Sequence, residues 1–497
     1  MLARGERDSI PGGVLFIEPI WLSILIPIFF ALVLLIASLA IRQWRQSAFD
    51  KAAFLAAAGA ALAFITGGAL FAALLVGFVL FTHWIALAIE RAADTRHPAS
   101  RPARAWLVVA VSAHLAMVVL ITRAGVITGP LQAIGRTIVP FGMSYFAFHG
   151  ISYVVDIYRR RAAAERSRWQ LAVHLVLLPQ IVGAPVAYEG VAPQLARRWT
   201  SISDYSYGVR RLLIGVWKVF VMASLAGTPA DAAFALRPGG LSAFQAWLGL
   251  VGFTLQMYYA FSGYTDMGIG LGRMLGIRLP ENFRWPYVGQ TVREFWQRWH
   301  VGLPAWFREY ADVSLDAGRV PPPSAGREAL VVLLCGIWYG VGWTFAVWGL
   351  YHAALIALER AGVEAALKRL PAPLRHAYLL VVVMAGWVVL RSETLGGALL
   401  FFKALAGLNA SGLRARPAIA PELWLVLAAG AIGCAPLFST IRRWTVVIDA
   451  LIVSLLMMLF ATVLFAWRCV WTIVAPVLRW WHWSRTQLGR RGGSALS

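Results

Sequence analysis

Long apolar runs separated by short basic segments make up most of this 497-residue chain. A helix needs about 20 consecutive apolar residues to cross the hydrocarbon core of a bilayer. Such runs predict membrane helices over residues 20–41, 106–121, 138–158, 212–225, 244–261, 377–390, 396–408, 423–438 and 446–474. The pattern therefore predicts an all-α polytopic integral membrane protein with roughly 11–13 membrane helices, including re-entrant or broken ones.

Two further apolar runs are not explained by a single span. Residues 52–89 are too long for one helix and Gly67-Gly68 divides them, which predicts a hairpin of two spans. Residues 171–188 contain two prolines and have basic residues at both ends. That combination favours a re-entrant or interfacial segment over a full span.

The apolar run over residues 330–358 contains several glycines and has basic residues at both ends. Basic flanks mark the cytoplasmic side of a membrane protein, so both ends are expected on that side. A broken helical hairpin fits this pattern, with its apex near residues 339–343, deep in the membrane and surrounded by protein.

The alternation of basic clusters with spans also predicts an orientation. Residues 1–13 lack the features of a cleavable signal peptide, and the N-terminus is expected outside. Arg96 and Arg160 are then cytoplasmic, and Gly240 is outside. The orientation of the C-terminal part stays open, because basic residues flank the run 446–474 on both sides.

The composition agrees with a protein whose solvent is lipid. Hydrophobic residues make up 60% of the chain and charged residues 14%, and the mean hydropathy is +0.68. These values exclude a water-soluble globular protein, a disordered chain, collagen and a coiled coil. The net charge of +22 does not indicate a nucleic-acid partner, because the basic residues lie between apolar runs rather than along one face.

Cysteine and histidine spacing predicts no metal site. The three cysteines lie in or beside apolar runs and form no CxxC motif. The nine histidines include no HExxH or other ligand spacing.

Charged and aromatic side chains concentrate in residues 281–300, where Arg293 and Glu294 adjoin phenylalanine and tryptophan. A charge at the bilayer centre costs about 3 kcal/mol even on a lenient scale. These side chains must therefore pair or line a wet cavity. Glu294 and Arg298 are four positions apart in the favourable order for a helix, so we predict an ion pair between them.

Asp266 and His352 each leave two interpretations open. An ionisable residue inside a membrane hairpin is a candidate for function, and His352 lies within the predicted hairpin. The alternative is a histidine that hydrogen-bonds inside its own helix. Asp266 is either a functional carboxylate or the cap of the next helix.

Several motifs together resemble one family of membrane enzymes. They are Pro140-Phe-Gly-Met-Ser-Tyr-Phe-Ala-Phe-His149, Asp156-Ile-Tyr-Arg159, Leu178-Pro-Gln-Ile-Val-Gly-Ala-Pro185, Phe261-Ser-Gly-Tyr-Thr-Asp-Met-Gly-Ile-Gly270, Pro280-Glu-Asn-Phe283, Pro286-Tyr287, Glu294-Phe-Trp-Gln-Arg-Trp-His300, Trp306-Phe-Arg-Glu-Tyr310, and Trp343-Thr-Phe345 with Trp348-Gly-Leu-Tyr-His352. Over about residues 14–410 the chain resembles the membrane-bound O-acyltransferase (MBOAT) family. The nearest branch is the alginate O-acetyltransferases (AlgI-like), and the D-alanyl transfer protein DltB is more distant.

The resemblance implies helices around a central funnel and the transfer of an acyl group. The donor is expected to be acetyl-CoA or another acyl thioester from the cytoplasm, used as a substrate, with no bound cofactor. The acceptor is expected to be an exported or cell-surface polysaccharide, alginate-like or another exopolysaccharide. Membrane lipid, a periplasmic acetyltransferase or other polysaccharide-modifying partner protein, and a bacterial inner-membrane location are also implied.

The resemblance also suggests site residues and a division of the chain. Catalysis is assigned to His300, Tyr339 and His352, and the cavity or donor site to Asp266, Asn282, Arg293, Glu294, Arg298, Trp299 and Trp343. The expected segments are a start (1–19), N-terminal membrane helices (20–260), a signature core with the cytoplasmic funnel and re-entrant hairpin (261–360), C-terminal membrane helices (361–476) and a basic tail (477–497).

The residue at position 339 decides between two functional interpretations. Family members carry a histidine in a Trp-His-Gly motif, where this chain reads Trp338-Tyr339-Gly340. Tyrosine, with an ordinary pKa of about 10, is a poor base at neutral pH but an adequate hydrogen-bond donor. An active enzyme would then need His300 or His352 as its base. The alternative is a catalytically impaired scaffold or acyl conduit that kept the fold.

Overall fold

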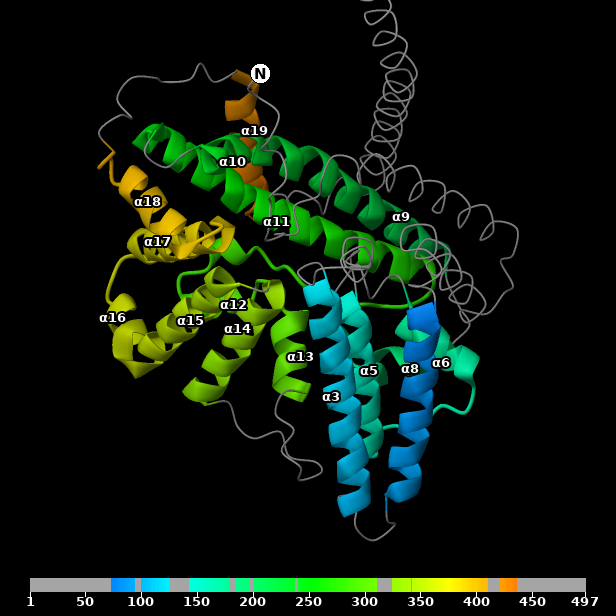
Figure 1. Ribbon diagram of the computed structural model, residues 1–497. Coiled ribbons are helices and arrows are strands. Elements are labelled where there is room, and N and C mark those ends of the chain that lie inside the picture. The colour runs from blue at the N-terminus through cyan, green and yellow to red at the C-terminus, as the bar shows by residue number, and fades with distance from the viewer. Residues whose placement is uncertain are drawn as a thin grey trace, which may run out of the picture. The chain divides into compact units, whose positions relative to one another are not determined.

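The computed structural model describes residues 73–93, 100–124, 143–177, 185–196, 201–236, 240–310, 324–340, 342–409 and 421–435 (Figure 1). The chain divides into two compact units, and the second, residues 17–42 and 441–497, lies outside the described residues. The predicted spans over residues 20–41 and 446–474 lie outside them too. All the elements named below belong to the first unit, and within the described ranges they are helices.

The N-terminal helices pack through aromatic and hydroxyl side chains. They are Ala73–Ala92, α3 (Arg101–Ala124) and α5 (Met143–Tyr158). The rings of Trp84 and Trp106 meet edge to face at 5.2 Å, and Thr82 Oγ1 lies 3.0 Å from His114 Nε2. Because these contacts join residues far apart in the sequence, they align the first helix with α3.

Two short helices follow, α6 (Arg168–Leu175) and α8 (Tyr188–Ala196). A helix of eight residues such as α6 rises only about 12 Å, too little to cross a bilayer. The described part of residues 171–188 is therefore consistent with a segment that does not span; residues 178–184 lie outside the described ranges.

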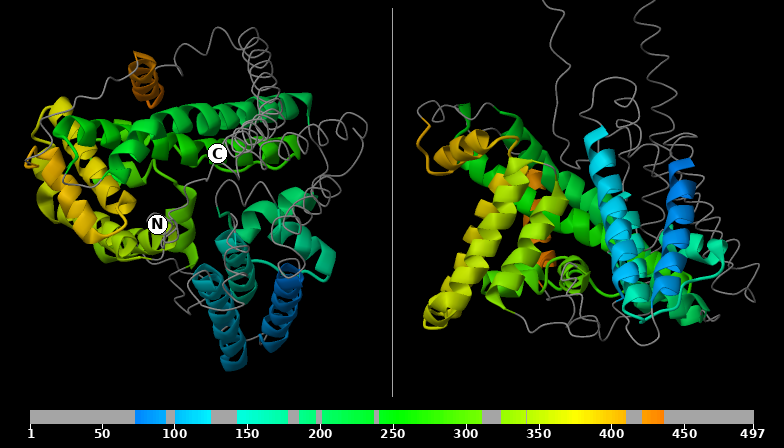
Figure 2. Two further views of the ribbon diagram at one scale, coloured as in Figure 1. Left: turned by 45° about the horizontal axis from the view of Figure 1, so that its top comes forward. Right: turned by 60° about the horizontal axis from the view of Figure 1, so that its bottom comes forward.

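The longest helices run alongside each other (Figures 1 and 2). One is continuous over α9 (Ile202–Trp217), the π-helix η1 (Lys218–Ala223) and α10 (Ser224–Ala235). The other is α11 (Ala243–Met274), whose start is fixed by a reciprocal capping box between Ser242 and Gln245. The sequence predicted that this helix would end near residue 261, so the structure corrects its C-terminal end.

Paired glycines let these two helices approach closely. Gly208 faces Gly270, and Gly215 faces Gly263, so the two glycines on each helix are seven positions apart. A Cβ atom on Gly215 would lie 2.5 Å from the carbonyl oxygen of Gly263. Backbones this close leave no room for any side chain, as at small-residue contacts between membrane helices.

The middle of the chain contains short helices and then a hairpin. The short helices are η3 (Pro286–Val288), α12 (Val292–Trp296) and α13 (Gly302–Tyr310). The hairpin consists of α14 (Ala325–Tyr339) and α15 (Trp343–Leu358), which pack together where a Cβ on Gly336 would lie 2.6 Å from Gly349 Cα. The helix break falls at the apex that the sequence predicted.

The C-terminal elements are η4 (Glu359–Val363), α16 (Glu364–Leu367), α17 (Ala372–Arg391), α18 (Leu395–Leu405) and α19 (Pro421–Gly433). Within the described residues, three helices are long and apolar enough to cross a membrane: Ala73–Ala92, Ser203–Ala235 and Ala372–Arg391. The chain is thus an all-α integral membrane protein in its described part. The expected total of membrane helices includes residues outside the described ranges.

Candidate active site

The structure brings His300 and Tyr339 together. Tyr339 is the last residue of α14, at the apex of the hairpin, and His300 lies in the turn between α12 and α13. The Nδ1 atom of His300 is 3.2 Å from the hydroxyl oxygen of Tyr339. Two of the three residues that the resemblance assigned to catalysis are therefore hydrogen-bonded to each other.

Trp299 completes this group, which we call the histidine–tyrosine site (Trp299, His300 and Tyr339). Its indole N–H donates to the Tyr339 hydroxyl at 3.1 Å. An indole can only donate, whereas a hydroxyl has two acceptor lone pairs and one proton. The Tyr339 oxygen therefore always accepts from Trp299, and it either donates to His300 Nδ1 or accepts a second proton from it.

The backbone of His300 is held in an unusual conformation. Its φ is 45°, in the left-handed region that costs a residue with a side chain about 1–2 kcal/mol. Asn282 holds the turn, because its backbone oxygen accepts from the Val301 N–H and its side-chain oxygen accepts from the Gly302 N–H, both at 2.9 Å. Strain that a surrounding network maintains is common at active sites.

Aromatic rings enclose the imidazole of His300, which is 1% exposed. It stacks on Phe283, with ring centroids 5.9 Å apart and planes 12° apart. Phe261 and Trp338 approach it at 6.2 and 5.9 Å. These rings bring no charge to the imidazole, so its contacts with them are neutral.

His352 lies one aromatic ring away from this site. Trp348 separates the two, with its ring centroid 5.3 Å from that of Tyr339 and 4.6 Å from that of His352. The His352 Nδ1–H donates to the Trp348 carbonyl oxygen at 3.0 Å, one turn earlier in α15. The interpretation as a hydrogen bonder inside its own helix therefore describes the contact that His352 makes.

Of the residues expected at a cavity, Trp299 belongs to the histidine–tyrosine site, and Asn282 bonds the two residues that follow His300. Arg293 instead donates to Glu364 at 2.6 Å, and Glu294 accepts the backbone N–H of Gln290 at 2.9 Å. Trp343 is 81% exposed at the start of α15 and does not join the site.

The predicted ion pair between Glu294 and Arg298 is wrong. Helix α12 ends at Trp296, so the two side chains do not share a helical face. The Arg298 guanidinium donates to the backbone oxygen of Arg284 at 3.3 Å. After the end of α12 the chain turns, and His300 lies against Tyr339 of the hairpin.

Asp266 belongs to a separate group of charges, the α9–α11 ion cluster (Arg211, Lys218, Asp266 and Glu281). Arg211 Nε and Lys218 Nζ each lie 2.8 Å from an Asp266 oxygen, and Arg211 also pairs with Glu281. Asp266 lies inside α11, so it does not cap the next helix. Sequence reasoning overlooked Arg211 and Lys218, although Lys218 interrupts the apolar run 212–225 and was a usable signal.

Comparison with known proteins identifies the family. The sequence model of the membrane-bound O-acyltransferase family matches residues 193–391, which include the whole histidine–tyrosine site. The "Probable alginate O-acetylase AlgI" of Pseudomonas putida is 35% identical over 340 residues, covering 65% of this chain and 68% of that protein. The chain belongs to the membrane-bound O-acyltransferase family. It is therefore a membrane-bound acyltransferase, and the resemblance inferred from its motifs is confirmed.

Two further relatives of this membrane-bound O-acyltransferase have other acceptors in their names. The peptidoglycan O-acetyltransferase of Helicobacter pylori is 28% identical over 379 residues, 68% of this chain and 71% of that protein. The teichoic acid D-alanyltransferase of Bacillus subtilis is 25% identical over 231 residues, 43% of this chain and 57% of that protein. The second relative shows that more than one acyl group is moved by proteins similar to this one.

Proposed function

We propose that this acyltransferase moves an acetyl group from a cytoplasmic thioester, such as acetyl-CoA, to a hydroxyl of an exported or cell-surface polysaccharide. The names of the alginate and peptidoglycan relatives support the acetyl group and the polysaccharide acceptor. The observation that carries the chemistry is the 3.2 Å contact between His300 Nδ1 and the Tyr339 hydroxyl. Arginine-rich segments around the signature core suit the phosphates of such a donor.

The reaction needs a base for the acceptor and donors for the oxyanion. His300 takes the acceptor's hydroxyl proton at Nε2 while the acceptor oxygen forms a bond to the thioester carbonyl carbon. The carbon–sulfur bond then breaks, and His300 returns the proton to the leaving thiolate. The products are an acetyl ester and a free thiol, so no further co-reactant is required.

The proposed reaction uses the tautomer of His300 in which Nδ1 carries the proton and bonds the Tyr339 hydroxyl. When His300 Nδ1–H donates to Tyr339, the Nε2 atom keeps its lone pair and can act as a base. The Tyr339 oxygen then accepts from both His300 and Trp299, and its own proton is free to donate to the developing oxyanion. Tyr339 thus orients the base and stabilises charge without being a base itself.

A catalytically impaired scaffold or acyl conduit is the second candidate. The tyrosine at position 339, where family members carry the Trp-His-Gly histidine, is the observation that favours it. In that case Tyr339 and Trp299 would only hold the hairpin apex against α12. The two candidates predict opposite effects of restoring a histidine at this position.

The decisive experiment measures O-acetyl content of exopolysaccharide and of peptidoglycan in a deletion strain that carries plasmid-borne variants. Wild type should restore acetylation and His300→Ala should abolish it. Tyr339→Phe should lower the transfer rate on the order of 10²-fold, as expected for loss of one oxyanion donor. His376→Ala is the matched control, because this half-buried histidine bonds the Gly289 carbonyl away from the site.

Three results would count against the active enzyme. Acetylation restored by Tyr339→His but not by wild type would identify the impaired scaffold. Tyr339→Phe equal to wild type would show that the hydroxyl has no chemical role. Equal losses in His300→Ala and His376→Ala would mean that the histidine effect is not specific to this site.

We also propose a bacterial inner-membrane location with several spans and a periplasmic acetyltransferase or other polysaccharide-modifying partner. Positive-inside asymmetry supports the orientation, with Arg160 cytoplasmic and Gly240 outside. A cysteine placed at each position should react with an impermeant maleimide in intact cells only at position 240. Labelling of position 160 from outside would overturn this orientation.

A further inference from the structure

Glu359 is a buried carboxylate for which the proposed reaction has no use. It follows α15 directly and is 1% exposed. One of its oxygens accepts the Val292 N–H at 2.7 Å and the other accepts the Arg293 N–H at 3.0 Å. The Tyr378 hydroxyl also donates to it, at 3.3 Å. The two carboxylate oxygens of Glu359 thus bind the backbone N–H groups of the first two residues of α12.

Charged side chains join the same elements a second time. Arg360 forms a two-point contact with Glu328, in the first turn of α14, with its Nε 2.9 Å from one carboxylate oxygen. Arg293 donates to Glu364 at 2.6 Å and lies 3.5 Å from Glu328. We call these residues together with Glu359 the base clamp (Arg293, Glu328, Glu359, Arg360 and Glu364). They tie the hairpin to α12 at the end opposite its apex, where α14 begins and α15 ends.

Two segments of the chain connect the base clamp to the histidine–tyrosine site, and each is a path along which a shift at the clamp can reach the site. One path is α14, which leads from Glu328 to Tyr339. The other is α12 and its tight turn, in which the Trp299 N–H donates to the Phe295 oxygen at 2.7 Å. His300 follows Trp299 directly, so a shift or rotation of α12 moves both groups that bond to Tyr339.

We infer that Glu359 is a positioning residue that sets the contact between His300 and Tyr339 by anchoring α12 to the hairpin. This inference rests on the proposed acyl transfer for its kinetic consequence, but the anchoring itself does not. The His300–Tyr339 distance of 3.2 Å is near the long end for a hydrogen bond. A displacement of well under 1 Å therefore weakens the bond that orients the imidazole.

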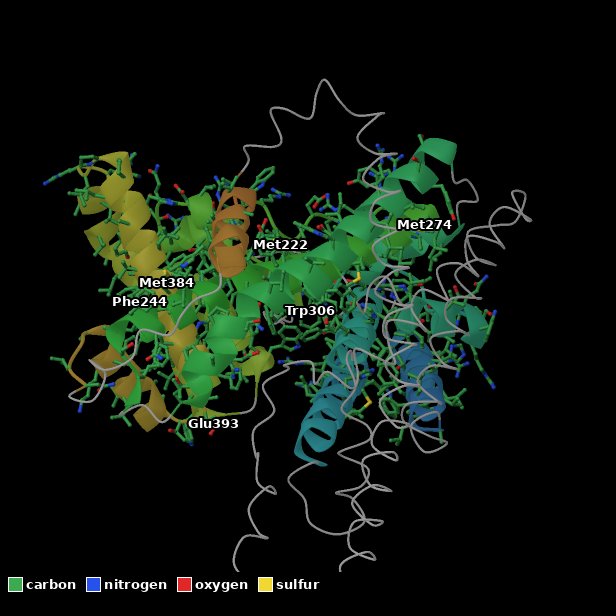
Figure 3. All side chains as sticks on the ribbon, turned by 90° about the horizontal axis from the view of Figure 1, so that it is seen from above. Met222, Phe244, Met274, Trp306, Met384 and Glu393 are labelled. Carbon is green, nitrogen blue, oxygen red and sulfur yellow. The ribbon has the colours of Figure 1, made fainter. Side chains whose placement is uncertain are left out.

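Glu359→Gln tests the inference because it preserves the shape and removes the charge. The amide keeps one acceptor oxygen, and its NH2 group then faces a backbone N–H. With purified protein in detergent, we expect kcat to fall about tenfold while KM for acetyl-CoA stays within twofold. Glu393→Gln is the matched control, because Glu393 is an exposed carboxylate at the edge of the side-chain view (Figure 3). It should match wild type.

A double-mutant comparison separates positioning from a general loss of structure. In a Tyr339→Phe background the hydrogen bond is already absent, so Glu359→Gln should change kcat less than about twofold. Equal falls in both backgrounds would overturn the positioning role. Tyr378→Phe removes only the weakest contact of Glu359 and should give a smaller, equally non-additive fall, which keeps the test available if Glu359→Gln folds poorly.

Hydrogen–deuterium exchange gives a readout that does not need activity. Glu359→Gln should speed exchange in peptides covering residues 289–302 and 336–340 and leave residues 243–274 unchanged. Unchanged exchange at residues 289–302 would overturn the anchoring. Faster exchange there, in a protein whose wild type transfers no acetyl group, would support the anchoring and refute the proposed function.

Discussion

The histidine–tyrosine site and the α9–α11 ion cluster each surround a buried polar side chain, His300 and Asp266, but they do so in opposite ways. The first contains neutral donors and acceptors enclosed by aromatic rings, with His300 stacked on Phe283. The second contains full charges, with Lys218 and Arg211 both on Asp266. It lies beside glycine pairs that bring α9 and α11 into backbone contact.

This difference separates a region that we expect to carry out the reaction from a region that we expect to stabilise the fold. A buried carboxylate between two cations holds together the helices that carry them, because its removal leaves partly buried positive charge with less compensation. An imidazole enclosed by neutral rings has no charged partner among the described residues, and its burial favours the neutral form, whose lone pair can accept a proton. We therefore expect changes in the ion cluster to unfold the protein and changes at the histidine–tyrosine site to stop the reaction.

The largest effect on stability is expected from Asp266→Asn. Removing one partner of a buried ion pair costs about 3–5 kcal/mol. Here Lys218 would lose its carboxylate contact, and Arg211 would keep Glu281 alone. Folded yield and thermal unfolding in detergent should both fall, and adding Lys218→Met should restore part of the loss. Asp204→Asn is the control, since Asp204 pairs with Arg273 at 2.7 Å in a more exposed place. A control as damaging as Asp266→Asn would contradict the comparison.

Gly215→Ala should have the next largest effect. The added Cβ would meet the Gly263 oxygen at 2.5 Å and Met267 N at 2.7 Å, and these are backbone atoms that cannot move aside alone. Overpacking of this kind costs about 1–3 kcal/mol, measurable as a lower thermal midpoint. Gly326→Ala has nothing within 4 Å of its Cβ and should be neutral. Equal midpoints for the two variants would mean that α9 and α11 separate easily.

Tyr339→Phe should cost little stability in spite of its large effect on transfer. It leaves the Trp299 N–H without its acceptor, a loss of about 1 kcal/mol. The thermal midpoint should therefore fall less than for Gly215→Ala, while activity falls far more. A variant that lost stability and activity in proportion would remove the distinction between the two regions.

The smallest effect should come from Glu364→Gln and should depend on pH. Hydrogen bonds from Lys368 and Arg293 hold the pKa of Glu364 below its ordinary value of 4.5. Because the folded-state pKa is lowered, the stabilisation is complete above the unfolded value and is lost as the pH falls through the folded one. At pH 7 the variant should lose less than about 1 kcal/mol, and near pH 3 the difference should shrink. A difference that grew in acid would contradict this.

Much of the fold was predictable because it depends on local pattern. The apolar runs over residues 106–121 and 377–390 lie within α3 and α17, and glycines beside basic flanks indicated a hairpin that breaks at residues 340–342. The length of α11 was not predictable in the same way. Its second half looks polar and glycine-rich, and it is helical because its glycines fit against another helix and its carboxylate is neutralised from there.

Apart from the extent of helices such as α11, the sequence by itself determined where the described helices lie, the hairpin and the family, because these depend on periodicity and on motifs that neighbouring residues complete. It also marked His300 and Tyr339 as candidates. Only the tertiary structure decided that these two meet while His352 stays behind Trp348, and that Glu294 and Arg298 do not pair. Partners that lie dozens of residues apart are selected by how helices pack, and packing depends on shape and compensation of charge across the whole unit, which spacing along one segment does not specify.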